Sequence, residues 1–115
     1  ITRIGHGVRS RESEETIAKL LDKNILLEIC PGSNIALGLY RSLDEHPINF
    51  FLNKNLPISI STDDPPFFST TLSKEYAALH NVFGWKEETF NKITKQSLKF
   101  AFCEPSLKEE LFQQL

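Results

Sequence analysis

A short apolar segment that ends in two acidic residues and two prolines places the strongest constraint on the fold. Residues 58–66 read Ile-Ser-Ile-Ser-Thr-Asp-Asp-Pro-Pro. Side chains alternate between the faces of a strand, so Ile58 and Ile60 share one face and Asp63 shares the other with two serines. Small residues followed by an acid fit the inside of a barrel of parallel strands, where catalytic groups lie at the strands' carboxyl ends. Asp-Asp-Pro also suits an Asx turn, and this segment alone leaves both interpretations open.

Two earlier segments have a similar character. Residues 2–8 read as a strand ending in Gly-His-Gly, and residues 25–30 as an apolar strand interrupted by Glu28, for which Arg3 is a candidate partner. A loop is expected from Pro31 to Leu43. Helical spacing predicts helices over about residues 12–23, 47–53, 72–83, 87–101 and 106–115, the last with a capping box from Ser106 to Glu109. This alternation is typical of an α/β fold with a parallel sheet.

The length, charge and cysteine content of the chain exclude several classes of protein. The chain has 115 residues and a formal net charge of −2, which suits one small domain and lacks the charge pattern of a nucleic-acid-binding protein. No apolar run is long enough to cross a membrane. Cys30 and Cys103 match no metal or redox spacing, so reduced thiols and a cytoplasmic location are expected. A closed eight-stranded barrel takes roughly 250 residues, so three strands do not close one.

Three motifs follow one another in order, each at the carboxyl end of a predicted strand. They are Arg-Ile-Gly-His-Gly at 3–7, Glu-Ile-Cys-Pro-Gly-Ser-Asn at 28–34 and Ser-Thr-Asp-Asp-Pro at 61–65. Together with the His46-Pro47 helix start, they resemble the adenosine deaminase family of zinc-dependent purine aminohydrolases. The resemblance implies a (β/α)8 TIM barrel, of which residues 1–115 would form the C-terminal part: about three β/α units and the terminal helices of a single domain, with the N-terminal strands absent from this chain.

The resemblance also implies a reaction and a site. The reaction would be hydrolytic deamination of a 6-aminopurine, either adenosine to inosine or adenine to hypoxanthine, with release of ammonia. Asp63 matches the family's zinc ligand and is a catalytic residue, and His6 matches a catalytic histidine that orients the attacking hydroxide. Asp64 and Gly5 would contact the purine. One Zn²⁺ is expected in the complete protein, and the implied partners are a small purine and the missing N-terminal portion, with neither nucleic acid nor membrane.

The chain departs from the family pattern in one large respect. The family's His-x-His pair and its His-Ala-Gly-Glu stretch, which supply further zinc ligands and a proton donor, do not occur here. A second hypothesis is therefore a truncated, non-catalytic fragment that does not bind zinc by itself. Against a bare turn, two adjacent carboxylates repel unless a nearby positive charge, such as a metal, offsets the repulsion.

The remaining polar and aromatic residues have simpler interpretations. We expect His46 to cap or pack a helix and His80 to lie at the surface or be partly packed. Glu28 suits a structural ion pair better than catalysis. Ser33 and Asn34 are predicted to make loop hydrogen bonds rather than substrate contacts. Phe67 and Phe68 are predicted to pack on the following helix, although a pocket wall is an alternative.

Overall fold

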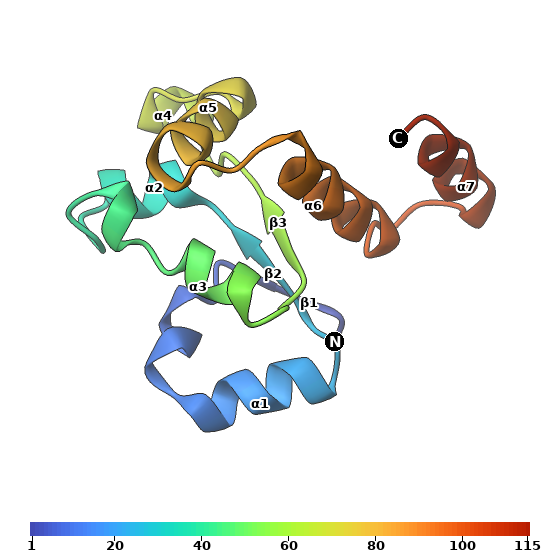
Figure 1. Ribbon diagram of the computed structural model, residues 1–115, viewed down its shortest axis with the longest axis horizontal. Coiled ribbons are helices and arrows are strands. Elements are labelled where there is room, and N and C mark those ends of the chain that lie inside the picture. Colours follow the sequence, from blue (N-terminus) through green and yellow to red (C-terminus); the bar gives the residue numbers. More distant parts are fainter.

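A three-stranded parallel sheet lies at the centre of the molecule. The computed structural model describes residues 1–115 and contains β1 (Arg3–Gly5), β2 (Leu26–Ile29) and β3 (Ile58–Ile60) in the spatial order β1-β2-β3 (Figure 1). Ile4 pairs with Leu27, and Leu27 pairs in turn with Ile58. All three strands and their parallel direction are confirmed.

Helices connect the strands and follow the last of them. They are α1 (Glu14–Asp22), α2 (Pro31–Ala36), α3 (Ile48–Asn53), α4 (Pro65–Phe68), α5 (Leu72–Phe83), α6 (Glu87–Lys99) and α7 (Pro105–Gln113), with 3-10 turns at Val8–Glu12 and Leu43–Glu45. None of these helices combines the length and apolar character that a bilayer span needs.

One face of the sheet forms the hydrophobic core with the surrounding helices. Leu27, Ile29 and Ile58 are fully buried on this face. The helices contribute core side chains that include Ile17 and Leu20 from α1, Ile48 and Phe51 from α3, Leu79 from α5 and Ile93 from α6. Ile60 belongs to the same core, whereas Ser59 is only half-buried. The predicted alternation of faces along β3 is therefore confirmed.

The opposite face of the sheet carries charged groups. The Arg3 Nε lies 3.1 Å from the Glu28 Oε1, so the candidate pair does form. The two side chains are 29% and 35% exposed, so the pair is not deeply buried and adds little to stability. The Arg3 guanidinium also lies over the ring of Phe102, 3.7 Å from its centroid.

Local capping explains where several helices begin and end. The Ser13 hydroxyl accepts a hydrogen bond from the Thr16 N–H at the start of α1, and Thr71 does the same for Lys74 in α5. Gly84 ends α5 with a φ of 69°, a left-handed conformation in which glycine carries no Cβ penalty.

Three predictions about local structure are wrong. Residues 31–36 form α2 rather than a loop, with Pro31 in the first helical turn, where a missing N–H costs nothing. Helix α7 begins at Pro105, so Ser106 lies inside its first turn and caps nothing. Phe67 is 85% exposed and does not pack on the next helix.

Candidate functional site

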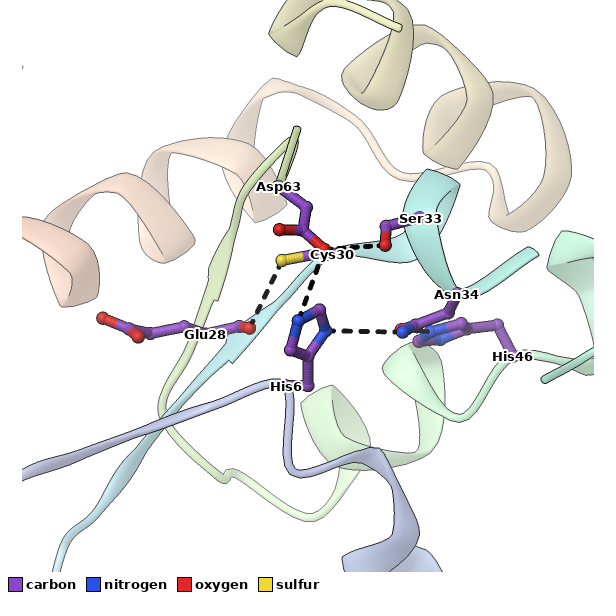
Figure 2. A network of polar contacts seen from close by, with 7 residues as sticks. All are labelled: His6, Glu28, Cys30, Ser33, Asn34, His46 and Asp63. Carbon is purple, nitrogen blue, oxygen red and sulfur yellow. Dashed lines mark hydrogen bonds and ion pairs between the residues drawn. The ribbon is translucent and has the colours of Figure 1, made fainter. Parts of the chain in front are cut away.

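The carboxyl ends of the three strands bring together one side chain from each motif. His6 follows β1, Cys30 follows β2, and Asp63 follows β3 by three residues (Figure 2). The His6 Nε2 lies 3.5 Å from the Asp63 Oδ2. One ligand atom each from His6, Cys30 and Asp63 lies within 4.8 Å of the others. The sequence predicts that His6, Asp63 and Asp64 converge at this end of the sheet. His6 and Asp63 do lie together, whereas Asp64 directly follows Asp63 but does not line the same pocket.

Both His6 and Asp63 have an unusual backbone conformation. Their φ angles are 55° and 59°, in the left-handed region that non-glycine residues seldom adopt. The backbone hydrogen bond from the His6 N–H to the Glu28 carbonyl, at 2.9 Å, ends the pairing of β1 with β2. The chain then turns sharply at the residue that carries the functional group. Strained conformations of this kind are concentrated at functional sites, which supports such an assignment here.

A buried serine holds one oxygen of Asp63. The Ser33 hydroxyl donates a hydrogen bond of 2.8 Å to the Asp63 Oδ2, and Ser33 itself is fully buried in α2. The Asp63 side chain is 29% exposed, so part of its carboxylate faces the open pocket. Ser33 therefore orients the carboxylate and leaves room for a further partner.

Cys30 is a neutral thiol at this site. Burial, followed by the negative charges of Asp63 and Glu75, raises the pKa of Cys30 to about 11. The thiol lies 3.7 Å from the Glu28 carbonyl oxygen, to which it donates a weak hydrogen bond. A cysteine binds a metal as the thiolate, so the carboxylate of Asp63 is the more suitable donor at neutral pH.

On its other side, His6 joins a chain of buried polar groups. Its Nδ1 lies 3.4 Å from the Asn34 Nδ2, and the Asn34 Oδ1 lies 2.8 Å from the His46 Nε2 (Figure 2). Asn34 and His46 are 2% and 3% exposed. The expectation that Ser33 and Asn34 are hydrogen-bonding residues is confirmed, but the sequence did not reveal that their partners are Asp63 and His6.

The remaining predicted site residues lie around an open pocket. Gly5 lines a pocket of about 370 Å³ together with His6, Cys30 and Asp63. Asp64 is exposed, stands just before α4 and makes no capping hydrogen bond through its side chain, and it is not among the lining residues. His80 is exposed and contacts the Trp85 carbonyl 2.7 Å away, apart from this site. The largest pocket, between α6 and α7, is lined mainly by charged and polar side chains and contains none of the predicted site residues.

A buried carboxylate supports the helix that carries Ser33 and Asn34. Glu75 in α5 is 3% exposed and accepts hydrogen bonds of 3.1 Å from the Gly32 N–H and from the Thr70 hydroxyl. A Cβ at Gly32 would overlap the Glu75 carboxylate, so only glycine permits this approach. The contact joins segments 43 residues apart and fixes the start of α2 beside the site.

Glu75 also yields a prediction about stability. Burial raises the pKa of Glu75, although its hydrogen bonds from Gly32 and Thr70 oppose this. The folded state therefore binds this proton more tightly than the unfolded state, so its contribution to stability falls as pH rises above the ordinary carboxyl range. We expect Glu75→Gln to remove this decline, and Glu75→Leu to cost about 1–3 kcal/mol by leaving the Gly32 N–H unpaired. Urea unfolding of the three proteins from pH 4 to pH 8 measures both effects. An identical pH dependence in wild type and Glu75→Gln would contradict the first.

Comparison with known proteins adds independent evidence. Residues 1–115 match a family model described as Adenosine deaminase. Adenine deaminase of Agrobacterium fabrum is 40% identical over 99% of this chain, which corresponds to 35% of the relative's length. The chain thus spans about a third of the length of the curated relatives that it matches.

Solved structures agree with this match. An adenine deaminase from Arthrobacter aurescens superposes with a TM-score of 0.94 and 25% identity over 98% of this chain and 35% of its own. Arabidopsis ADAL, solved in complex with IMP, superposes with a TM-score of 0.85 and 31% identity, over 95% of this chain and 32% of its own. An amidohydrolase from Burkhoderia ambifaria, solved with bound Zn, is 19% identical with a TM-score of 0.82 over 96% and 31%, and it supports the fold alone. The chain therefore has the fold of part of a (β/α)8 barrel, as predicted.

Proposed function

Because the chain belongs to the adenosine deaminase family, we propose that it forms the C-terminal part of one barrel domain that hydrolytically deaminates a 6-aminopurine. The observation that carries this proposal is the convergence of His6 and Asp63, 3.5 Å apart, at the carboxyl ends of two parallel strands. In barrels of this kind, that end of the sheet carries the catalytic groups.

We assign Asp63 as a zinc ligand. Its carboxylate is an oxygen donor of a type that zinc accepts, and it is partly exposed to the pocket beside His6, which supports the fit. When bound, zinc supplies a hydroxide nucleophile at neutral pH by lowering the pKa of water to about 7. A catalytic zinc site takes at least three protein ligands, so the rest of the barrel must provide the others.

The residues of this chain then have separate roles in the reaction. His6 orients the oxygen that attacks C6 of the purine, and the Ser33 hydrogen bond keeps the Asp63 carboxylate in place. Gly5 adds no side chain to the pocket wall and leaves space for the purine. Asp64, directly after the ligand, binds the purine ring. One water adds across the N1–C6 bond of the purine, with its oxygen on C6 and one proton on N1. The remaining hydroxyl proton then leaves with the amino group as ammonia, and C6 keeps a carbonyl oxygen.

The test uses the complete barrel protein. We expect it to contain about one zinc per chain and to release ammonia from adenine, adenosine or AMP, with adenine as the best substrate because it is the one named for the relatives. Zinc is measured by elemental analysis, and ammonia by a coupled assay before and after chelation and zinc addition. Full zinc occupancy with no release from any of the three would reject the proposed reaction. A folded protein that takes up no zinc would favour the non-catalytic alternative.

A further inference from the structure

We propose that Asn34 and His46 are positioning residues that fix the tautomer of His6, so that its Nδ1 accepts a hydrogen bond and its Nε2–H faces Asp63. Only the kinetic consequence rests on the proposed function, because the tautomer is a property of the folded chain.

The first link has an unambiguous direction. The backbone N–H of Ile48 lies 3.0 Å from the His46 Nδ1, and a backbone N–H only donates. The Nδ1 of His46 must therefore be unprotonated and accept this bond. The single proton of the neutral ring is then on Nε2.

The second link follows from the first. The His46 Nε2–H donates to the Asn34 side chain at 2.8 Å, so the atom that it meets must be the amide oxygen. This fixes the orientation of the Asn34 amide group. The amide nitrogen of Asn34 then faces the His6 Nδ1 at 3.4 Å and donates to it. The His6 proton is consequently on Nε2.

Neighbouring groups keep His46 neutral and hold Asn34 in the orientation that donates to His6. Burial lowers the pKa of His46 to about 4, so the ring stays neutral near pH 7 and keeps an acceptor for Ile48. The Tyr40 ring packs against His46 with centroids 5.0 Å apart. Asn34 is held in α2 by a backbone hydrogen bond of 3.0 Å from its N–H to the Cys30 carbonyl.

The consequence lies at the pocket. With its proton on Nε2, His6 presents a donor toward the Asp63 Oδ2, 3.5 Å away, and toward an attacking oxygen beside it. The other tautomer would turn a lone pair toward the carboxylate, which is repulsive. Substitution of a residue that orients a group at a reacting centre, without contacting the substrate, typically lowers activity by about 10- to 100-fold. We expect a loss of this size in kcat when the chain of hydrogen bonds is broken.

The experiment reads the tautomer directly. The complete barrel protein is labelled with ¹⁵N-histidine, and the ring nitrogen shifts of His6 are recorded at pH 8 in zinc-depleted and zinc-loaded samples. We expect one Nε2–H tautomer in the wild type and a mixture in Asn34→Leu and His46→Phe. Asn34→Asp supplies only acceptors and should move the proton to Nδ1. His46→Gln keeps a donor and an acceptor and should preserve the wild-type tautomer, and His80→Gln is the control for an exposed histidine.

Kinetics provide the second measurement. Asn34→Leu and His46→Phe should lose about 10- to 100-fold in kcat, with KM and zinc content unchanged. An Nδ1–H tautomer in the wild type would overturn the proposal without any variant. So would a tautomer that stays the same in Asn34→Leu, His46→Phe and Asn34→Asp. If the protein deaminates no purine, the ring shifts still decide the proposal, so its failure is distinct from that of the proposed function.

Discussion

Replacing Asp63 with alanine is expected to abolish zinc binding and deamination together in the complete protein. The carboxylate is the one acidic group of this chain that lies within 4.8 Å of the His6 and Cys30 ligand atoms, and Ser33 already orients it. A bound metal contributes several kcal/mol to transition-state stabilisation, and each 1.36 kcal/mol is tenfold in rate. The expected loss in kcat/KM is therefore at least about 10³-fold.

The neighbouring acid provides a matched control. Asp64→Ala removes the same charge one residue away, but Asp64 makes no contact with His6 or Cys30. This variant should retain zinc while kcat/KM falls by about 10- to 100-fold, as expected for one lost hydrogen bond to a charged group. Zinc content measured beside kinetics separates the two cases. Full zinc occupancy in Asp63→Ala would show that the ligand is assigned to the wrong residue.

The sheet was predictable because its strands carry strong local signals. The apolar run at 25–30, interrupted only by Glu28, and the alternation at 58–61 are sufficient to define buried strands without tertiary information. The short helix α2 was not predictable in this way. Pro31 and Gly32 are typical turn residues, and the helix start is stabilised by Glu75, which is 43 positions away. The same limit applies to Phe67, since no pattern tells which aromatic side chain the fold leaves exposed.

The site residues that directly follow strands were predictable from the sequence. His6 and Asp63 both follow predicted strands, and parallel strands bring their carboxyl ends to one edge. The residues that orient them lie outside the strands, and sequence spacing gives no indication of their partners. Asn34 reaches both His6 and His46 because α2 turns it inward, and His46 stands directly before Pro47, the N-cap residue of α3. The His-Pro pair was the one available signal, and it indicated a helix start rather than a link to the site.

The burial of His46 predicts a loss of stability in mild acid. Its pKa is lowered from 6.5 to about 4, so between these values the unfolded state binds a proton that the folded state excludes. The contribution of His46 to the free energy of unfolding is therefore fully present above about pH 6.5. It falls as pH decreases toward 4, by about 3 kcal/mol in total. The folded ring resists protonation because burial in a site that is 3% exposed disfavours the charged form, and a proton on Nδ1 would also face the Ile48 N–H.

A single substitution separates this effect from the other groups that titrate in the same range. His46→Gln keeps an acceptor for Ile48 and a donor for Asn34 but does not titrate. Glu75 and the other carboxylates contribute equally to both proteins, so they cancel when the free energies of unfolding of variant and wild type are subtracted. Urea unfolding of the complete protein at pH 4, 5, 6 and 7 should show that wild type loses about 3 kcal/mol more than His46→Gln across this range. His80→Gln, at an exposed position, should follow the wild type. If His46→Gln and wild type lose stability in parallel, His46 is not held neutral by burial, and the hydrogen bond from Ile48 does not set its protonation.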